Sequence, residues 1–395
     1  MSGFSSAEKN ALRERASGIP EALQNNMARF PDTDAPILLA GAEYCGIWLE
    51  HNQDNLFITD WYPEVAWQSQ KIFIDKQRAD GMLPAALRYV PKHVVCFAQL
   101  QSVYAFARCA LETAKLCHRP EEDFAAIYRA GCRYDEFLQL HRNRSGSGLV
   151  EMYCAYDTGH DNSPRVRDGG IPNACPDRDA VNMPDLPCMP LLAADLSATR
   201  YGGLTALAEL AEMFGDSRRA AIYTEQAAEL KARMFELLYD PADEFFYDRA
   251  PQGLRKYRTE HITRLFLNGV LNQQEFDSVY DRYFAPGKEF FTAFPYPSMS
   301  PLDKAFCQNL PPNCWGSNTQ MLTLLRALIW MPRYNRTGDL CKVLKRVLRA
   351  FCDFSNDFGQ ELDPFTGRKI SGNGGYTPAM LLFYQACNMP GVLEE

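Results

Sequence analysis

The chain lacks several features that would place it in a common functional class. Its 13 cysteines form no Cys-x-x-Cys pair, which argues against a disulfide framework and against a clustered zinc site. No stretch reaches the roughly eighteen apolar residues that a membrane span requires, and no run of Lys or Arg is present. The formal net charge is −8. Together these absences disfavour nucleic acids and membranes as partners.

The first residues also lack the pattern of a secretory signal. Residues 1–9 (Met-Ser-Gly-Phe-Ser-Ser-Ala-Glu-Lys) contain neither a basic segment nor an apolar segment of the kind that signal peptides carry. With scattered, unpaired cysteines, this pattern is typical of a protein kept in a reducing compartment. We therefore expect a cytoplasmic protein. The sequence leaves its oligomeric state open, and a homo-oligomer is compatible with it.

Apolar residues recur every three or four positions along most of the chain. The 395 residues are 46% apolar and 23% charged, which is enough to bury a sizeable core. Residues 204–214 and 223–238 carry this spacing on either side of Gly215-Asp216, which predicts a helical hairpin. Further helices are expected at 7–30, 62–78, 94–117, 121–140, 261–271, 273–283, 318–330, 338–354 and 378–388. No interval shows sustained strand-like alternation.

Two kinds of helix alternate, and this predicts the fold class. Residues 94–107 and 379–384 are apolar on nearly every side, whereas residues 225–237 carry charged side chains on one face. Fully apolar helices belong inside a protein and amphipathic helices outside. We therefore predict an all-α protein, an (α/α)6 barrel or six-hairpin toroid, forming a single domain over residues 1–395. Residues 1–30 would be an N-terminal helical segment, and the polar insertion at 165–190 an ordered loop over the site.

Two polar, turn-rich islands interrupt the helical pattern. The first spans residues 157–165 (Asp-Thr-Gly-His-Asp-Asn-Ser-Pro-Arg) and the second residues 359–367 (Gly-Gln-Glu-Leu-Asp-Pro-Phe-Thr-Gly). So many polar groups would each need a buried partner in a core, so these islands are better explained as loops that line a site. Two separate carboxylate loops on a helical scaffold are typical of glycoside hydrolysis, which uses one carboxyl group as an acid and another as a base.

The first island resembles a signature of the trehalase-like glycosidases, Glu-Ser-Gly-x-Asp-Asn-Ser-Pro-Arg. This clan comprises glycoside hydrolase families 37 and 63, with the trehalases, processing α-glucosidases and mannosylglycerate hydrolases. Further segments are similar to clan motifs and occur in the same order. They are residues 54–57 (Asp-Asn-Leu-Phe), 77–84 (Gln-Arg-Ala-Asp-Gly-Met-Leu-Pro), 194–197 (Ala-Asp-Leu-Ser), 361–367 (Glu-Leu-Asp-Pro-Phe-Thr-Gly) and 375–377 (Gly-Tyr-Thr). The resemblance covers roughly residues 50–385.

The chain also departs from the clan pattern. Asp157 replaces the leading Glu of the signature, and Val166 stands where a Trp follows the Arg. No Trp precedes Asp54 directly, and residues 314–318 (Cys-Trp-Gly-Ser-Asn) keep one Trp of a Trp-Arg-Gly-x-x-Trp element and lose its Arg. Because these positions contact sugar in the relatives, the departures indicate an outlying member with a different substrate.

The resemblance implies roles for individual residues. It makes Asp161 the general acid and Glu361 the general base of an inverting mechanism, which needs carboxyl groups about 6.5–9.5 Å apart. Burial and the charge of Asp157 or Glu361 would raise the pKa of Asp161, whereas Arg165 would lower it on contact. Arg165 is therefore expected to face the sugar or Asp157. The expected substrate contacts are Asp54, Trp61, Asp157, His160, Asn162, Arg165, Trp315 and Gln360. Neither a metal nor an organic cofactor is implied.

Structural roles compete with these assignments. Asp161 could cap a helix at Ser163-Pro164, and Glu361 could be an exposed loop acid. Asp157 could bridge backbone amides of its loop. Trp315, Trp61 and Trp48 could each be either a sugar platform or part of the core. Asp54 could be a structural hydrogen-bonding group, and Asp195 a helix cap.

Other functions are possible on the same barrel. A sugar isomerase resembling the N-acylglucosamine epimerases would need two histidines as acid and base, and none of the six histidines forms a spaced pair. A non-catalytic sugar-binding protein would be expected to have lost one carboxylate. A zinc-dependent lanthionine-cyclase-like barrel is disfavoured because an adjacent Cys-His pair occurs once, at Cys117-His118. The sequence therefore favours an inverting, exo-acting α-glycosidase that releases a glucose-like or mannose-like residue from a small glycoside.

Overall fold

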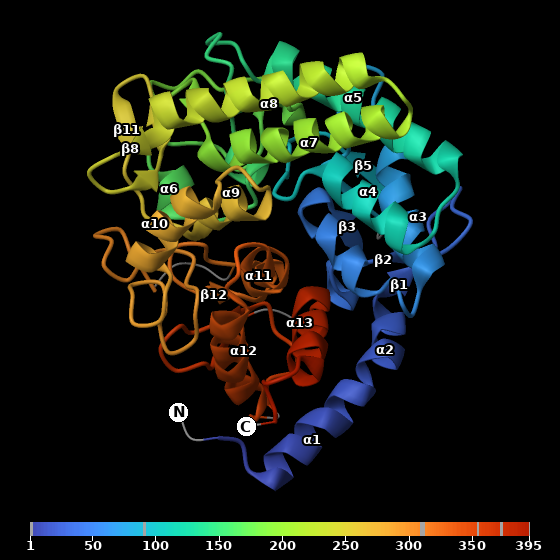
Figure 1. Ribbon diagram of the computed structural model, residues 1–395, viewed down its shortest axis with the longest axis vertical. Helices are drawn as coiled ribbons and strands as arrows, with labels where there is room; N and C mark the ends of the chain where they lie inside the picture. The colour runs from blue at the N-terminus through green and yellow to red at the C-terminus, as the bar shows by residue number, and fades with distance from the viewer. Residues whose placement is uncertain (1–2, 90–91, 309–312, 354, 372–373, 395) are drawn as a thin grey trace.

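A computed structural model describes residues 3–89, 92–308, 313–353, 355–371 and 374–394, and the fold is rich in helices (Figure 1). The α-helices are α1 (Ser6–Ser17), α2 (Ile19–Ala22), α3 (Pro63–Asp75), α4 (Phe106–Leu116), α5 (Glu121–His141), α6 (Pro164–Arg167), α7 (Ala194–Met213), α8 (Ser217–Leu238), α9 (Thr263–Leu267), α10 (Gln273–Tyr283), α11 (Met321–Arg333), α12 (Thr337–Phe351) and α13 (Thr377–Asn388). A 3-10 helix that is important for the site, η3, spans Leu49–Phe57.

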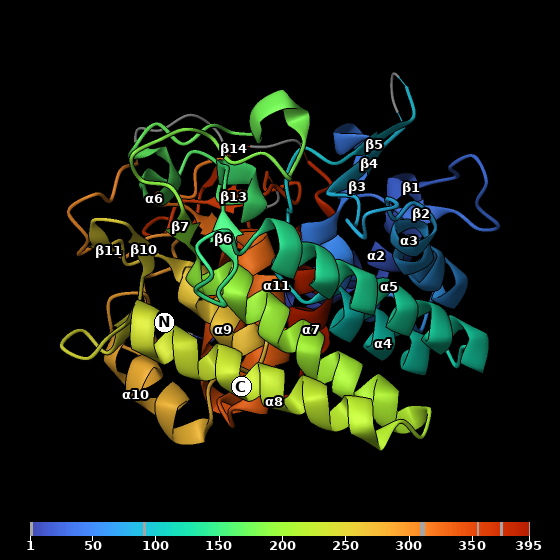
Figure 2. The same cartoon turned by 90° about the horizontal axis from the view of Figure 1, so that it is seen from above.

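Short antiparallel strands lie between the helices. Three-stranded sheets are formed by β3 (Gly46–Trp48), β4 (Ala86–Arg88) and β5 (Val94–Cys96), and by β12 (Thr319–Gln320), β13 (Glu361–Leu362) and β14 (Lys369–Ser371). A four-stranded sheet has the order β11 (Gly253–Arg255), β10 (Asp248–Ala250), β7 (Leu191–Leu192), β6 (Glu151–Met152). Pairs are formed by β1 (Met27–Ala28) with β2 (Ile37–Leu38), and by β8 (Tyr239–Asp240) with β9 (Phe245–Phe246). Seen from above, strands of the three larger sheets gather toward one end of the helices (Figure 2).

Six helical segments follow one another in a cycle of contacts. Neighbours touch from η3 to α4, α7, α9, α11 and α13, and α13 in turn contacts η3. Each segment of the cycle also packs against a further helix: α3 on η3, α5 on α4, α8 on α7, α12 on α11 and α1 on α13. Helix α10 joins α9 through the rings of Phe276 and Phe266, whose centroids lie 4.8 Å apart. The arrangement pairs each segment of the cycle with a partner, as the hairpin pattern of the sequence predicts.

The hairpin α7–α8 shows how the sequence forms this pairing. Gly215 ends the first helix with a φ of +75°, a conformation that costs glycine little. The carboxylate of Asp216 then accepts a hydrogen bond from the Arg219 amide and caps α8. In α8 the buried positions repeat at Ala220, Ala227, Leu230, Met234 and Leu238, whereas twelve of the twenty residues of α7 are buried. Thus α7 lies deeper than α8, as the charge pattern predicts.

Some boundaries differ from the sequence prediction. The predicted helix at 94–117 is divided, because Val94–Cys96 forms strand β5 and helix α4 begins only at Phe106. Val94 and Val95 are exposed rather than buried, and β-branched residues suit a strand. The N-terminal segment is helical through α1, α2 and a 3-10 turn up to Asn26, after which β1 begins. By contrast, α10 spans the predicted residues 273–283. Residue 354 of the predicted 338–354 helix lies outside the described residues.

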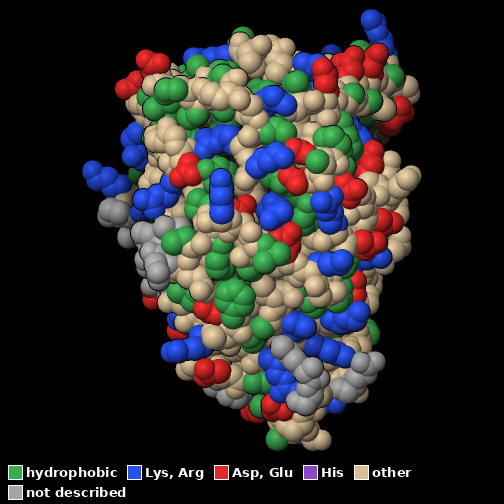
Figure 3. All heavy atoms as spheres, turned by 90° about the vertical axis from the view of Figure 1, so that its left-hand side faces the viewer, with side chains coloured by type: hydrophobic (Ala, Val, Ile, Leu, Met, Phe, Trp, Pro, Cys, Tyr) green, Lys and Arg blue, Asp and Glu red, His purple; other side chains and the backbone are tan. Residues whose placement is uncertain are grey.

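Within the described residues, no helix combines the length and the apolar character needed to cross a membrane. On the face shown in Figure 3, Lys and Arg side chains are interspersed with acidic and apolar ones.

Candidate active site

A cavity of about 590 Å³ is lined by residues of the short strands and of the loops between the helices. Its wall comes from β3–β5, the start of η3, the first polar island, the 165–190 insertion, residues 313–315 and the second polar island. Ala174 and Arg178 contribute the part that belongs to the insertion. Among the described lining residues, two carry a carboxyl group, Glu50 and Asp161.

Asp161 reaches this cavity from the loop between His160 and α6. Its Oδ2 accepts a hydrogen bond of 2.6 Å from the Asn313 side-chain amide. Its Oδ1 is buried and has no hydrogen-bond partner among the described residues. Burial, followed by the negative charges of Glu50 and Glu361, raises the pKa of Asp161 well above its usual value, and the Asn313 bond opposes this only in part. Oδ1 is therefore the oxygen that no described group engages.

The second polar island places two neighbouring side chains differently. Gln360 lines the cavity, and its amide donates a hydrogen bond of 2.7 Å to Asn313 Oδ1. The hydroxyl of Tyr44 donates to Gln360 Oε1. Glu361, at the start of β13, is fully buried and is not among the lining residues. Adjacent residues of a strand point to opposite sides, which accounts for the difference.

The carboxylate of Glu361 is held by several donors. Its Oε1 accepts from the Cys314 amide at 2.6 Å and from the Gln320 side chain at 2.7 Å. Its Oε2 accepts from the Asn313 amide at 3.1 Å. These bonds fix the 313–315 segment, which carries the cavity residues Asn313 and Trp315. In this geometry Glu361 positions the wall of the cavity.

Glu50 approaches Asp161 from the first turn of η3. Gln101 donates a hydrogen bond of 2.9 Å to Glu50 Oε1, while the buried Oε2 has no partner within the described residues. Gly159, with a φ of +66°, lies against this carboxylate, and a β-carbon there would come within 2.1 Å of Oε2. Burial raises the pKa of Glu50, and the charge of Arg326 opposes the shift. The glycine of the first polar island thus brings the Asp161 loop onto Glu50.

Trp315 forms another part of the wall and rests on buried polar groups. Its ring lies 5.0 Å from that of His160, centroid to centroid. The His160 ring is held on both sides, by Glu260 at 2.6 Å and by a guanidinium nitrogen of Arg165 at 2.9 Å. Burial lowers the pKa of His160 to about 3, so the ring is neutral. It is a support for Trp315 and does not itself line the cavity.

Arg165 is buried beneath the site and away from the cavity. Its guanidinium forms paired hydrogen bonds with Asp195, at 2.7 and 2.9 Å, and with Asp248, at 2.7 and 2.8 Å. Arg264 joins the same cluster through Asp195 and Glu260. The expected contact of Arg165 with sugar or with Asp157 is therefore absent from this geometry. The cluster fixes the loop that carries Asp161.

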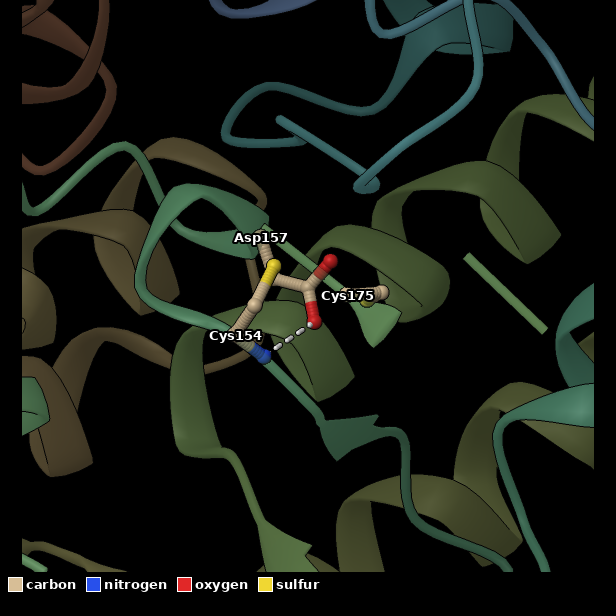
Figure 4. A group of neighbouring side chains, drawn as sticks. All are labelled: Cys154, Asp157 and Cys175. Atoms are coloured by element: carbon tan, nitrogen blue, oxygen red, sulfur yellow. Dashed lines mark hydrogen bonds between the residues drawn. The ribbon is translucent and has the colours of Figure 1, made fainter. Parts of the chain in front are cut away.

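Asp157 lies in a second buried ion pair. Both of its oxygens accept from Arg142, at 2.6 and 3.0 Å, and backbone amides of Leu100, Tyr153 and Cys154 donate to them as well. Figure 4 shows Asp157 beside Cys154 and Cys175, a grouping of metal-ligand type. The guanidinium of Arg142 lies where a metal ion would have to bind Asp157. Asp157 and Arg142 therefore form a structural ion pair rather than a substrate contact.

The remaining predicted contacts also lie outside the cavity wall. Asp54 is buried in η3 and accepts a hydrogen bond of 2.8 Å from Gln53, and burial raises its pKa to about 8. Trp61 packs edge-on against Tyr384, with the ring centroids 4.5 Å apart. Asn162 donates to the Asn313 carbonyl at 3.2 Å. Trp48, in contrast, lines the cavity.

Sequence reasoning missed Glu50 and a set of basic residues at the mouth. Arg88, Lys92 and Arg178 line the cavity, are exposed, and form no ion pair with a carboxylate in the part of the chain that the structure describes. Glu50 follows Trp48 by two residues. This aromatic residue close to an acidic one was the feature of the sequence that could have indicated Glu50 as a site residue. Arg178 is far from Arg88 and Lys92 in the sequence, and no local pattern there indicates that the three basic residues meet at one cavity.

Three buried histidines predict how stability depends on pH. Burial lowers the pKa of His51 and His160 to about 3 and that of His261 to about 4. An unfolded histidine titrates near 6.5, so as the pH falls below that value the unfolded chain binds protons that the folded chain does not. The three histidines should therefore lower the free energy of unfolding between about pH 7.5 and about pH 5.5, by about 1 kcal/mol each, whereas Asp54, whose pKa burial raises to about 8, changes it in the opposite direction.

Urea titrations at the two pH values test this prediction. The exposed His118, whose φ is +50°, provides a control; the substitution His118→Asn should leave the pH dependence intact. His261→Gln isolates one histidine: its free energy of unfolding should fall by about 1 kcal/mol less between the two pH values than that of the wild type. The same pH dependence in both proteins would contradict the neutral state of this histidine.

Comparison with known proteins identifies the family. The model of the mannosylglycerate hydrolase MGH1-like glycoside hydrolase domain matches residues 59–377. The chain belongs to this family. It is therefore a glycoside hydrolase, and the resemblance to the trehalase-like clan is confirmed. None of the curated proteins matches the chain in sequence.

Solved structures share the fold of this MGH1-like hydrolase. The family 63 mannosylglycerate hydrolase of Thermus thermophilus, in complex with Tris, is 16% identical with a TM-score of 0.71, over 94% of this chain and 99% of that one. The neutral trehalase of Saccharomyces cerevisiae is 12% identical with a TM-score of 0.68, over 96% of this chain and 80% of that one. A rhamnosidase from Klebsiella oxytoca is 15% identical with a TM-score of 0.60, over 98% and 64% respectively.

Proposed function

We propose that this hydrolase is an inverting, exo-acting α-glycosidase that removes a glucose-like or mannose-like residue from a small glycoside. The observation that carries the proposal is Asp161: a carboxyl group with a raised pKa and a free oxygen, facing a cavity at the end of a glycoside hydrolase domain. We further infer that the cycle from η3 to α13 is the inner ring of an (α/α)6 barrel and that residues 1–395 form one domain. A cytoplasmic location remains our prediction.

In the proposed reaction, Asp161 donates its proton to the glycosidic oxygen as the bond from that oxygen to the anomeric carbon breaks. A water molecule attacks the anomeric carbon from the opposite face and loses a proton to a carboxylate base, which inverts the configuration. Asn313 orients the acid by its hydrogen bond to Oδ2 and leaves Oδ1 for the proton. Trp48 and Trp315 supply aromatic faces for a sugar ring.

Exo-action is supported by the walls around Asp161. The insertion at 165–190 contributes Ala174 and Arg178, and strands β4 and β5 contribute Arg88 and Val94. A cavity enclosed in this way suits the end of a small glycoside better than the middle of a polymer. Hydrolysis of α-mannosides, α-glucosides and glycosylglycerates, followed by release of the free sugar, tests the function. Turnover of at least one such compound is expected, and inactivity on all of them would contradict the proposal.

The basic mouth supports an anionic aglycone. Arg88, Lys92 and Arg178 lack carboxylate partners among the described residues, so a carboxylate on the leaving group would neutralise them. One of the solved relatives, the Thermus thermophilus mannosylglycerate hydrolase, has a structure in complex with Tris and D-glycerate. Arg88→Gln and Arg178→Gln should each raise KM for an α-glycosylglycerate by about 2- to 5-fold.

A neutral glycoside of the same sugar isolates the effect of charge. For this substrate, the KM of each variant should equal that of the wild type. The increase should also shrink at high salt, because exposed charges are screened. Arg167→Gln, on an exposed side chain of α6 outside the cavity wall, is the matched control. An equal rise in KM for neutral and anionic substrates would contradict a role for charge at the mouth.

The isomerase alternative has less support. An epimerase-type reaction needs two histidines at the reacting carbon. Of the histidines that the structure describes, His51 alone lines the cavity, and its Nε2 is engaged by the Tyr376 hydroxyl at 2.9 Å.

A further inference from the structure

A chain of side-chain amides connects the two carboxyl groups that the clan resemblance assigns to base and acid. It runs from Glu361 through Gln320, Gln360 and Asn313 to Asp161. The Gln320 amide nitrogen donates to Glu361 Oε1 at 2.7 Å, and the Gln320 oxygen accepts from Gln360 at 3.4 Å. Gln360 also donates to Asn313 Oδ1 at 2.7 Å, and Asn313 donates to Asp161 Oδ2 at 2.6 Å. Each end of the chain therefore presents an N–H group to a carboxyl group.

The groups at the Glu361 end fix the orientation of every amide in this chain. Both oxygens of Glu361 face N–H donors, and the Cys314 carbonyl, 3.3 Å from the Gln320 nitrogen, can likewise only accept. Gln320 therefore turns its nitrogen to these acceptors and its oxygen to Gln360. The two hydrogens of the Gln360 amide are then both used, one on Gln320 and one on Asn313. Because the oxygen of Asn313 is held at Gln360, its nitrogen faces the acid.

Further contacts hold Gln360 and Asn313 in place. The Tyr44 hydroxyl donates to the Gln360 oxygen, so that both ends of this buried amide are bonded. Asn313 has a φ of +62°, a conformation that asparagine adopts more readily than most residues. Its backbone amide donates to Glu361 Oε2 at 3.1 Å. Amides that are bonded on both sides in this way keep a single orientation.

We propose that Gln360 is a positioning residue for the acid, acting through Asn313 by holding the amide nitrogen of Asn313 on Asp161 Oδ2. The assignment rests on the proposed function, in which Asp161 is the acid. An N–H group cannot accept a proton, so the proton of the acid stays on Oδ1, which no described group engages. In the reversed orientation, the Asn313 oxygen would accept a proton from Oδ2 and hold it away from the leaving oxygen. This role differs from the substrate contact that the sequence predicts for Gln360.

The test compares the best substrate among the α-mannosides, α-glucosides and glycosylglycerates with the α-glycosyl fluoride of the same sugar, because fluoride leaves without help from an acid. Gln360→Met keeps the size of the side chain and removes its hydrogen bonds. It should lower kcat for the glycoside by about 10-fold, because a misplaced acid transfers its proton less often, and kcat for the fluoride by less than about 2-fold. KM should change little for either compound. Gln273→Met, exposed at the start of α10, is the matched control and should behave as wild type.

A second variant tests whether Gln360 acts through Asn313. Asn313→Gly removes that side chain at a φ that glycine adopts freely, and it keeps the backbone amide that contacts Glu361. This variant should also lose about 10-fold or more in kcat for the glycoside. In the Asn313→Gly background, Gln360→Met should cause no further loss, because the link to Asp161 is already broken. Urea titration of each variant checks that the kinetics are those of a folded protein.

The outcomes separate this assignment from the function itself. A loss of kcat that is confined to the glycoside and absent in the Asn313→Gly background supports the assignment. Equal losses on glycoside and fluoride, or a rise in KM with kcat unchanged, would make Gln360 a substrate contact and overturn it. Losses that multiply in the double variant, or full activity of Asn313→Gly on the glycoside, would overturn it as well. In all these cases the wild type is still a glycosidase, whereas a wild type inactive on every glycoside would overturn the proposed function and the assignment with it.

Discussion

Asp161→Asn should lower kcat for an alkyl α-glycoside by about 10²- to 10⁴-fold, because asparagine cannot donate the proton that the leaving oxygen needs. The side chain keeps its shape and retains a carbonyl oxygen that can accept from Asn313. The loss should therefore fall on the chemical step, with little change in stability. On an α-glycosyl fluoride the same variant should lose much less, because fluoride leaves unprotonated.

This difference between substrates is the measurement that identifies an acid. Asp60→Asn, at an exposed position next to Trp61, provides a control with the same change in charge. Equal losses on the alkyl glycoside and on the fluoride would show that Asp161 binds or positions the sugar and does not protonate it. Full activity of Asp161→Asn on the alkyl glycoside would remove it from the mechanism.

Arg165→Met should destabilise the protein by about 3–5 kcal/mol, the usual cost of removing one partner from a buried ion pair. The guanidinium is 1% exposed and bridges Asp195 and Asp248. Arg264 would still contact Asp195, whereas among the described residues Asp248 would keep the bond from the Ala194 amide and no other side-chain hydrogen bond. Arg165→Lys should recover little of the loss, since an ammonium group cannot form both paired contacts.

Urea titration of the free energy of unfolding measures this effect, with Arg167→Met as the exposed control two residues along α6. The same variant should also lose activity, because Arg165 holds the His160 ring on which Trp315 rests. A change in stability below about 1 kcal/mol, as for ordinary surface substitutions, would contradict the view that this buried cluster holds the Asp161 loop in place.

The sequence predicted the helices well and their exact starts less well. The repeated spacing of apolar residues located α5, α10 and α13 to within one residue and the end of α8 at Leu238, because each helix buries one continuous face. The segment before α4 was misassigned for a related reason. Residues 94–105 are as apolar as a buried helix, and periodicity does not separate such a run from a strand followed by irregular chain.

The candidate site was predicted mainly from one motif. The prediction failed where a shift of a few residues along the chain decides which side chain reaches the cavity. The run 157–165 pointed to Asp161, which lies in the cavity. In the second island Glu361 was predicted as the base and Gln360 as a substrate contact. Neighbouring residues of a strand point to opposite faces, so Gln360 lines the cavity and Glu361 is buried beside it. In η3 the substrate contact was predicted at Asp54, four residues beyond the cavity residue Glu50.

The buried ion pairs could not be predicted from the sequence at all. Arg165 and Asp248 are 83 residues apart in the chain, and Arg142 pairs with Asp157 across 15. A charged residue in a polar loop gives no local sign of whether it turns toward solvent, substrate or a distant partner. Only the packing of β10 and α7 beneath the signature loop shows that Arg165 supports the site from behind.

The stereochemistry of the first-formed product tests the central claim most directly. Proton NMR during the first minutes of hydrolysis of an α-glycoside distinguishes the two anomers of the released sugar before they equilibrate. An inverting enzyme with Asp161 as its acid should release the β-anomer first. Release of the α-anomer would mean retention of configuration and would contradict the mechanism proposed for this enzyme.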